Sequence, residues 1–362
     1  MEIKKLKVGI LGATGTVGQK FIVLLKNHPW FEITALAASP QSRGKFYSEA
    51  IEGRWKMNQP IPDNICGKKV KAIEEDFDGI INEVDLVFSA IDLDKEKIRQ
   101  IEEKYASAGA AVVSNNSAHR WTEDVPMIMP EINAHHLSLI DIQRKNRGWK
   151  TGLIVVKPNC SLQSYLPVVH ALGKFNPRYV SVTTLQAISG AGKTFDSWPE
   201  MIDNCIPFIS GEEEKTEKEP LKILGPSCPV ISATCVRVPV SDGHMASVSI
   251  KFEKKPSLKE IYEAIDNYPN PLSGLKLPSA PDKFITYFTE NDRPQTKLDR
   301  DYGNGMGVTC GRFREDSGDG WKFISLSHNT TRGAAGGAIL NAELLHKKGY
   351  LKTRIQNLGY RI

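Results

Sequence analysis

The sequence predicts an α/β protein of two domains, an N-terminal doubly wound parallel sheet and a second, α+β domain with a mixed sheet. Three observations favour this class. The chain has 362 residues, more than one hydrophobic core normally organises. Short apolar segments alternate with amphipathic ones in the first part of the chain, as in a parallel sheet with helical connections. Longer, β-branched, partly alternating segments follow, which are typical of a mixed or antiparallel sheet.

The expected first domain spans residues 1–157 and is completed by a C-terminal helix within 331–362. Its first elements are a strand at Lys7–Leu11, an amphipathic helix at Gln19–Asn27 and a strand at Phe31–Ala38. The further elements expected here are the strands Val84–Ala90, Ala111–Ser114 and Leu153–Val156, the helix Lys95–Tyr105 and the closing helix Gly333–Lys348.

The expected second domain spans residues 158–330, and the resemblance described below implies that it combines catalysis and dimerisation. We expect strands at Tyr179–Gln186, Cys235–Val240 and Ala246–Phe252. The acidic run 212–214 is interpreted by default as a solvated helix start.

Composition excludes several classes of protein. The net charge is +5 with interspersed signs and no long Lys/Arg run, a poor basis for binding nucleic acid. No segment has the apolar length of a membrane span or of a secretory leader. The six cysteines are scattered without a CxxC pair, so neither a metal site nor a disulfide framework is indicated. A reducing cytoplasm fits best.

A glycine-rich turn follows the first expected strand. Gly12, Gly15 and Gly18 form a GxxGxxG pattern directly before the expected helix. Glycines at such a turn let the backbone approach a pyrophosphate, which lies at the helix N-terminus. The spacing departs by one residue from GxGxxG. Its place in an alternating chain nevertheless favours a Rossmann-type dinucleotide site over a turn that only packs the helix.

The end of the second strand indicates which dinucleotide is bound. An NAD site usually has an acidic residue there, which binds the ribose 2′-hydroxyl. The corresponding segment has no carboxylate and instead carries Ser39, Ser42, Arg43 and Lys45. Hydroxyls and cations suit a 2′-phosphate, so we expect NADP rather than NAD. The alternative is an ordinary polar loop.

Cys160 occupies a second strand–turn–helix position, after Leu153–Val156 and before an apolar segment. A helix N-terminus stabilises a thiolate, and an ordinary thiol with a pKa of ~8.5 needs activation at neutral pH. His244 is expected on a Gly-bearing turn between two strands, where it could serve as the base. The alternative is that Cys160 is buried filler, the commoner role for a single cysteine.

The segment Ala187–Thr194 nearly matches a P-loop, with alanine at the first glycine position. That pattern would indicate an ATPase. Pro199 soon follows, no acidic strand motif accompanies the segment, and a nucleotide site is already expected at the N-terminus. We therefore favour the NADP-binding interpretation over an ATPase.

These residues resemble the aspartate-semialdehyde dehydrogenase family, especially its archaeal and fungal-like branch. The matching motifs run nearly end to end and are Gly9–Gln19, Ser114–Arg120, Val125–Asn133, Pro158–Ser161, Ser189–Gly192, Gly211–Lys215, Arg237–His244, Leu326–Thr330 and Arg332–Gly337. The chain departs from the residues common in the family at Lys157, Ser161–Gln163 and Lys193–Phe195.

The resemblance implies a role for each matched position. The implied catalytic residues are the nucleophile Cys160, the acid/base His244, Gln186, which orients the acyl group, and Asn159. The implied substrate contacts are Arg237 for the carboxylate, Glu212 for the amino group, and Arg120, Asn116 and Lys215 for the phosphate. The implied cofactor contacts are Gly12, Thr14, Gly15, Thr16, Val17, Ser39, Ser42, Arg43, Ser189, Gly190, Asn329 and Gly337.

The implied reaction is the NADPH-dependent conversion of L-aspartyl-4-phosphate to L-aspartate 4-semialdehyde, in lysine, threonine and methionine biosynthesis. His244 deprotonates Cys160, the thiolate displaces phosphate, and hydride reduces the thioester. A dimer or a dimer of dimers is implied.

Three alternatives remain open: a CoA-thioester reductase such as malonyl-CoA reductase, N-acetyl-glutamyl-phosphate reductase, and a non-catalytic Rossmann protein that senses NADP. Asn159 and Glu212 favour an aminoacyl phosphate as the substrate.

Overall fold

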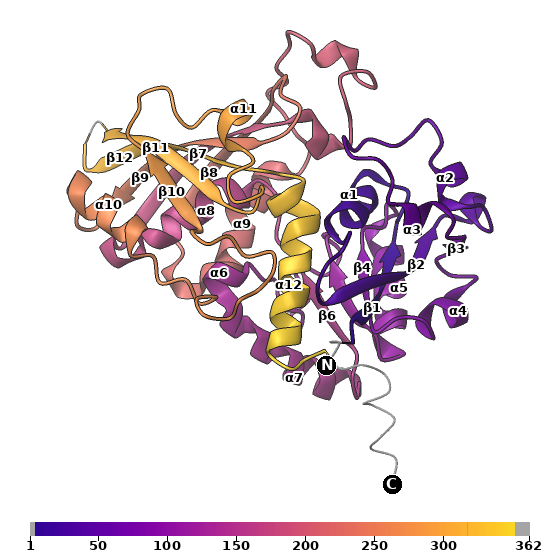
Figure 1. The fold of residues 1–362 in the computed structure, drawn as a ribbon. Coiled ribbons are helices and arrows are strands. Elements are labelled where there is room, and N and C mark those ends of the chain that lie inside the picture. Colours follow the sequence, from indigo (N-terminus) through magenta and orange to yellow (C-terminus); the bar gives the residue numbers. More distant parts are fainter. Residues whose placement is uncertain (1–3, 317, 352–362) are drawn as a thin grey trace.

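The N-terminal part of the chain forms an all-parallel sheet in the computed structural model, which describes residues 4–316 and 318–351 (Figure 1). Its strands are β1 (Leu6–Leu11), β2 (Phe31–Ala38), β3 (Val70–Ala72), β4 (Leu86–Ser89), β5 (Ala111–Ser114) and β6 (Leu153–Val156). They lie in the order β3-β2-β1-β4-β5-β6, so the winding reverses between β1 and β4. Ligands of such sheets bind beyond the carboxyl ends of the strands at this point. The expected doubly wound sheet is confirmed.

Helices cover both faces of this sheet because its central strands are buried throughout. Val8 and Ile10 share one core with α1 and the C-terminal helix, whereas Val112 and Ile154 share the other core with α5. The helices of this part are α1 (Thr16–Leu24), α2 (Tyr47–Ala50), α3 (Asp63–Cys66), α4 (Phe77–Ile81), α5 (Lys95–Ser107), α6 (Pro130–Asn133), α7 (Leu139–Arg147) and α12 (Gly336–Lys347).

Three helices differ in their bounds from the expectation, and α5 does so only by extending to Ser107. Helix α1 begins at Thr16, inside the glycine motif, and ends at Leu24; Asn27 has a left-handed φ of 59°, which an α-helix does not contain. Helix α12 begins at Gly336 after a π-helical turn at Thr331–Ala335. The part of the expected C-terminal helix beyond residue 351 lies outside the described residues.

The second part of the chain forms a mixed sheet. Its strands are β7 (Pro177–Gln186), β8 (Val230–Arg237), β9 (His244–Phe252), β10 (Ile285–Phe288), β11 (Val308–Glu315) and β12 (Gly320–Ser327). They lie in the order β10-β11-β12-β9-β7-β8. The pairs β10–β11 and β7–β8 are parallel, and the three pairs between them are antiparallel. The expected strand Cys235–Val240 is wrong in its bounds. The strand ends at Arg237, and Pro239, which has no N–H to donate, lies in the turn that leads to His244.

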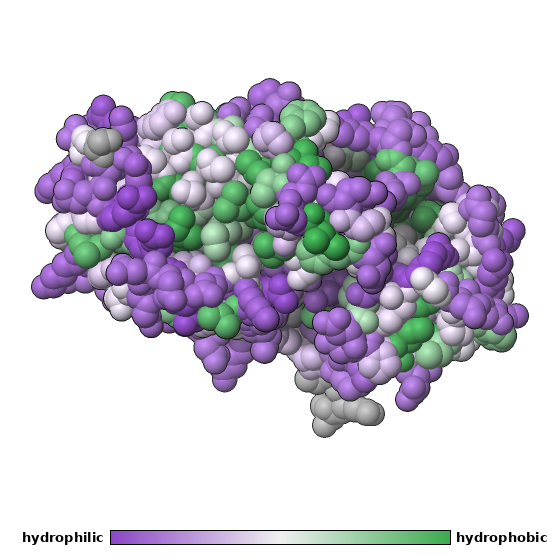
Figure 2. Space-filling model, turned by 90° about the horizontal axis from the view of Figure 1, so that it is seen from above, coloured by the Kyte–Doolittle hydropathy of each residue, from purple (hydrophilic) through white to green (hydrophobic). Residues whose placement is uncertain are grey.

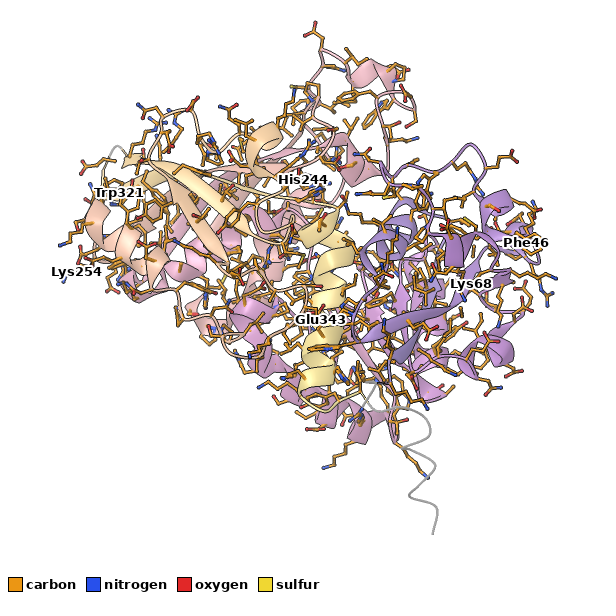
Figure 3. All side chains as sticks on the ribbon, viewed as in Figure 1. Phe46, Lys68, His244, Lys254, Trp321 and Glu343 are labelled. Carbon is orange, nitrogen blue, oxygen red and sulfur yellow. The ribbon has the colours of Figure 1, made fainter. Side chains whose placement is uncertain are left out.

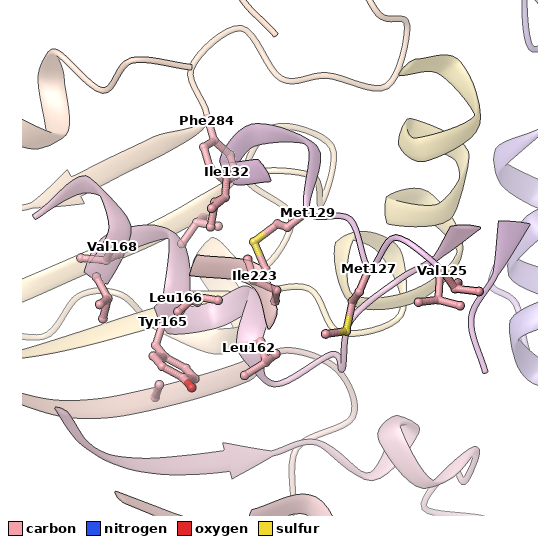
Figure 4. Close-up of a cluster of buried hydrophobic side chains, with 14 of the residues drawn as sticks. Val125, Met127, Met129, Ile132, Leu162, Tyr165, Leu166, Val168, Ile223 and Phe284 are labelled. Atoms are coloured by element: carbon pink, nitrogen blue, oxygen red, sulfur yellow. The ribbon is translucent and has the colours of Figure 1, made fainter. Parts of the chain in front are cut away.

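Helices α8 (Leu162–Ala171), α9 (Glu212–Leu224), α10 (Leu258–Asp266) and α11 (Thr296–Asp299) complete this part. Helix α8 packs on the mixed sheet. Its Leu162 and Leu166 share a buried cluster with Met127 and Met129 from the connection between β5 and β6 (Figure 4). The turn that carries Cys160 therefore rests on a rigid core.

Buried polar contacts join the two domains along α12, which runs between them (Figure 1). Glu343 of α12 is fully buried; it accepts a hydrogen bond from Ser279 Oγ at 2.5 Å and lies 2.9 Å from His28 Nε2 (Figure 3). In the described part of the chain no helix is long and apolar enough to cross a membrane.

Candidate active site

Cys160 and His244 come together at the boundary between the domains. Cys160 lies just before α8, and its Sγ is 3.5 Å from Nε2 of His244, the first residue of β9. His244 is fully buried and lies near the N-terminal end of α12 (Figure 3). The two residues that the sequence singles out as nucleophile and base are thus in contact, although 84 positions separate them.

The hydrogen bonds of His244 fix which ring nitrogen carries the proton. The Ala187 N–H donates to Nδ1 at 3.1 Å, so the neutral ring holds its proton on Nε2, facing the Cys160 sulfur. Burial lowers the pKa of His244 to about 3, and the positive charge of Arg237 acts in the same direction. In this arrangement the ring presents an N–H to the sulfur, and the role of His244 as acid/base stays a prediction.

The environment of Cys160 combines burial with cations. Burial raises the pKa of its thiol to about 11, and the carboxylate of Glu212 adds to the increase. Lys157, Arg120 and Arg237 oppose it. Burial thus outweighs the stabilisation expected from the helix N-terminus, and ionisation of the thiol depends on the cations.

Glu212 is the centre of a polar cluster beside the thiol. Both of its carboxylate oxygens accept from Asn159 Nδ2 at 3.0 Å, and Oε1 also accepts from Lys215 Nζ at 2.8 Å. Gln186 Nε2 donates to Oε2 at 3.3 Å. Helix α9 does begin at Glu212, but the expectation that this start is solvated is wrong for Glu212, which is buried.

Arg237 lies at the end of β8, opposite Gln186 at the end of β7. Its Nη1 donates to Ala187 O at 2.6 Å, and its guanidinium has no carboxylate within ion-pairing distance in the described part of the chain. A Cβ added to Gly190 would lie 2.9 Å from Arg237 Nη1 and 3.0 Å from His244 Cε1. Gly190 therefore packs against both side chains, and Arg237 keeps donors for a ligand.

Arg120 and Asn116, the expected phosphate contacts, are engaged within the protein. Arg120 Nη1 pairs with Glu219 Oε1 at 2.7 Å, and its Nε donates to Lys157 O at 3.1 Å. Asn116 Nδ2 donates at 3.0 Å to Glu102 Oε1 within a buried cluster. Their role toward phosphate stays a prediction.

The sequence did not identify two residues of α9 that lie at the site, Glu219 and Lys222. Buried Glu219 accepts from the Asn159 N–H at 2.7 Å as well as from Arg120, so it links the nucleophile turn to that guanidinium. Lys222 Nζ donates at 2.8 Å to three carbonyls of the 120–125 loop, and burial lowers its pKa to about 8. The seven-residue spacing from Glu212 to Glu219 places both on one helix face, which is the signal that could have revealed Glu219.

A cleft lies at the glycine turn between β1 and α1. The cavity has a volume of about 360 Å³, and Gly12, Thr14, Gly15, Ser39 and Arg54 are among its lining residues. Gly12 has a left-handed φ of 89°, and a Cβ there would lie 2.2 Å from Ala90 O. The close backbone cradle at a helix N-terminus fits a dinucleotide pyrophosphate. Thr16 and Val17 form the first turn of α1 at this cleft.

The other expected cofactor contacts lie apart from this cavity. Arg43 forms a two-pronged pair with Asp76, and Ser42 is buried. Neither residue lines the cavity, whereas Arg54, which was not singled out, does. Asn329 Nδ2 donates to Ser189 Oγ at 2.9 Å, next to the catalytic pair, and Gly337 packs against Lys157.

The P-loop interpretation of Ala187–Thr194 is wrong. A short 3₁₀ turn at Ile188–Ala191 follows β7, and in the described chain no helix begins after Lys193 until Pro199. A P-loop requires a helix N-terminus directly behind its glycines.

A cleft that fits a dinucleotide, in the same chain as a thiol–imidazole pair, is typical of oxidoreductases. Residues 7–140 match the model "Semialdehyde dehydrogenase, NAD binding domain", and residues 167–332 match "Semialdehyde dehydrogenase, dimerisation domain". The chain belongs to the semialdehyde dehydrogenase family.

Individual relatives agree over nearly full length. The aspartate-semialdehyde dehydrogenase of Archaeoglobus fulgidus is 46% identical over 349 residues, covering 94% of this chain and 98% of the relative. The crystal structure of aspartate semialdehyde dehydrogenase with NADP from Candida albicans superposes with a TM-score of 0.84 at 39% identity, covering 96% of this chain and 100% of that one. The NADP malonyl CoA reductase of Metallosphaera sedula is 37% identical over 364 residues, 97% and 99% of the two chains.

Proposed function

We propose that this protein is an NADP-dependent aspartate-semialdehyde dehydrogenase, which reduces L-aspartyl-4-phosphate to L-aspartate 4-semialdehyde and releases phosphate. The observation that carries the proposal is the Cys160–His244 pair, bordered on one side by the free guanidinium of Arg237 and on the other by the Glu212 carboxylate. The reaction serves the biosynthesis of lysine, threonine and methionine.

The substrate's two charged ends match these two side chains. Arg237 offers a desolvated guanidinium to the α-carboxylate, which it can bind with two parallel hydrogen bonds. Glu212 offers a buried carboxylate to the α-ammonium, with Asn159 holding both of its oxygens. Lys215, Arg120 and Asn116 are proposed to face the phosphate, with Lys215 half-buried at the rim.

The reaction proceeds through a thioester. The Cys160 thiolate attacks the acyl carbon, the bond to the phosphate oxygen breaks, and phosphate leaves with the electron pair. The next step requires a hydride at the thioester carbon, which is the chemistry that bound NADPH supplies. The Nε2–H of His244 can donate a hydrogen bond to the developing oxyanion. The oxyanion then re-forms the carbonyl, the carbon–sulfur bond breaks, and the Cys160 thiolate leaves with the electron pair. Gln186 is proposed to orient the acyl group.

Gly12, Thr14, Gly15, Thr16 and Val17 are proposed to hold the pyrophosphate. Ser39 and Ser42, with Arg43, are proposed to face the 2′-phosphate. Ser189, Gly190, Asn329 and Gly337 are proposed to contact the cofactor's other end, since they lie beside Cys160, His244 and Lys157.

Malonyl-CoA reduction is the second candidate, since one relative is described as a malonyl CoA reductase. Malonyl-CoA has a carboxylate but no ammonium. Glu212 would then keep Lys215, Asn159 and Gln186 as partners but would bind no group of the substrate. We therefore favour the aminoacyl phosphate.

The assay that separates these candidates follows NADP reduction with L-aspartate 4-semialdehyde in the presence of phosphate or arsenate. Rates that depend on either anion and not on CoA are expected. The matched control replaces the substrate and the acceptor by malonate semialdehyde and CoA. Reduction that requires CoA and ignores phosphate would defeat the proposal.

We further propose a cytoplasmic homo-oligomer, either a dimer or a dimer of dimers, which the mixed sheet assembles. Domain bounds of 1–157 with 331–362, and 158–330, are proposed with it. Exposed apolar side chains support an interface: Ile202 and Phe208 before α9 are 62% and 65% exposed, and Val230 of β8 is 67% exposed. Figure 2 shows apolar patches among the hydrophilic surface of the upper face. Light scattering of the purified protein measures the oligomeric state.

A further inference from the structure

Lys157 is a buried amine that the reaction steps above leave unused. It follows β6 and is 2% exposed, the one fully buried lysine among the described residues. Its Nζ donates to Pro158 O at 2.7 Å. An ammonium has three N–H donors, yet over residues 4–316 and 318–351 the structure gives it no second acceptor and no carboxylate within ion-pairing distance.

The amine and the Cys160 thiol lie against the same glycine-rich segment. A Cβ added to Gly337 would lie 2.9 Å from Lys157 Cε and 3.3 Å from its Cδ. A Cβ added to Gly333, four residues earlier, would lie 2.9 Å from Cys160 Cβ. Glycine at both positions thus makes room for the lysine stem and for the cysteine, side by side at the entry to α12.

We propose that Lys157 is a positioning residue for the nucleophile, whose ammonium stabilises the thiolate of Cys160. The inference deepens the proposed function and rests on it, since a thioester mechanism needs a thiolate. Proton transfer from Sγ to Nζ breaks the S–H bond, forms an N–H bond and leaves a thiolate–ammonium pair without net charge. In a buried site each of these charges offsets part of the desolvation of the other.

The charges around the amine fit this role. Burial lowers the pKa of Lys157 to about 7, and Arg120 and Arg332 act in the same direction. Cys160 and Glu219 raise that pKa.

His244 cannot take the thiol proton while Ala187 N–H donates to its Nδ1, because Nε2 already carries the proton of the neutral ring. Among the cations that lower the pKa of Cys160, Lys157 has the largest influence, and its amine, unlike the guanidinium groups of Arg120 and Arg237, can be neutral and accept a proton.

The test measures alkylation of Cys160 by iodoacetamide against pH, with the Cys160 peptide followed by mass spectrometry. Lys157→Met removes the charge at similar volume. Lys157→Gln also removes it but keeps a donor for Pro158 O. In both variants we expect the apparent pKa of Cys160 to rise by at least one unit and the alkylation rate at pH 7.5 to fall at least tenfold.

The control is Lys71→Met, which removes a lysine that pairs with Glu83 and does not act on Cys160. It should leave the alkylation profile unchanged. An unchanged Cys160 profile in folded Lys157→Met or Lys157→Gln overturns the proposal. The assay contains no substrate, so its outcome does not depend on whether the proposed substrate is correct.

The melting temperature at two pH values separates the effect of the Lys157 charge from the effect of its packing. The pKa of Lys157 in the folded protein, about 7, lies below its ordinary value of 10.5. Protonation therefore disfavours the folded state, increasingly as the pH falls from about 10.5 to about 7. Lys157→Met should raise the melting temperature at pH 7 by a few degrees and have no such effect above pH 10.5. A variant that is less stable at pH 7, or unfolds, would show a structural lysine and contradict the proposal.

Discussion

Two pairs of buried cations surround the catalytic cleft, and they differ in their partners. In the first pair each guanidinium holds a buried carboxylate. Arg120 lies 2.7 Å from Glu219, and Arg332 binds Glu131 through two contacts of 2.8 and 3.0 Å. Both carboxylates are fully buried.

In the second pair, Arg237 and Lys157 are equally buried but each side chain donates to one main-chain carbonyl and lacks a carboxylate among the described residues. Burying a charge costs free energy unless it is paired. If these two cations served packing alone, we would expect each of them to contact a buried carboxylate. The difference indicates that the paired cations hold the structure together, whereas the unpaired ones are kept for groups that arrive with the substrate or form during turnover.

The largest effect is expected at the thiol that both pairs surround. Cys160→Ser replaces the thiol by an alcohol of far higher pKa and should lower kcat by about 10⁴-fold or more while the fold persists. The steady-state rate and the circular dichroism spectrum measure the two effects. Cys66→Ser, at the half-exposed cysteine of α3, is the control and should keep full activity. Near-normal turnover of Cys160→Ser would exclude it as nucleophile.

Breaking a paired cation should act on stability. Glu131→Gln leaves Arg332 as an unpaired buried charge between α6 and the entry to α12, and should lower the free energy of unfolding by about 3–5 kcal/mol. Urea unfolding measures it. The surface control is Glu83→Gln, which breaks an exposed pair with Lys71 and should cost less than about 1 kcal/mol. Equal losses in the two variants would remove the distinction between the buried and the surface pair.

Changing an unpaired cation should act on turnover instead. Arg237→Lys keeps the charge and loses the fork, so transition-state binding should weaken by about 1.5–3 kcal/mol, on the order of 10- to 150-fold in kcat/KM for aspartate semialdehyde. NADP binding should change little. Melting temperature and kinetics on one preparation decide the case. A destabilised variant with normal activity per folded molecule would move Arg237 into the structural class.

The sequence predicted what local patterns encode. The glycine turn at Gly12–Gly18 and the strand–turn position of Cys160 are contiguous, so their geometry follows from a few adjacent residues. The parallel sheet and the contact between Cys160 and His244 were predicted correctly, the latter from residue types and turn context. The hydrogen bond from the Ala187 N–H to His244 Nδ1 could not be predicted, because it joins segments 57 positions apart.

The carboxylates were harder to predict. Glu219 meets Arg120 across 99 positions, and Glu131 meets Arg332 across 201. Local sequence patterns cannot predict these ion pairs, because the partners come together only when α9 and α6 pack in the folded protein. The predicted end of β8 was also wrong, because the apolar residues after Arg237 lie in a turn that contains Pro239 and not in the strand.

The smallest effect is expected at Arg43, a paired cation on the surface. The sequence assigns it to the 2′-phosphate of NADP, yet its guanidinium binds Asp76 and lies outside the cavity at the glycine turn, which Arg54 lines. An exposed pair contributes little, so Arg43→Ala should lower kcat/KM for NADPH by less than about threefold. Arg54→Ala should lower it more, because Arg54 lines the cleft. The wild type should prefer NADPH to NADH, since the segment after β2 carries Ser39 and no carboxylate. Measuring kcat/KM with both cofactors for the three proteins tests all of this. Equal kcat/KM values for NADPH and NADH in Arg43→Ala, but not in Arg54→Ala, would show that Arg43 leaves Asp76 when NADP binds. The distinction between paired and unpaired cations would then apply only to buried residues.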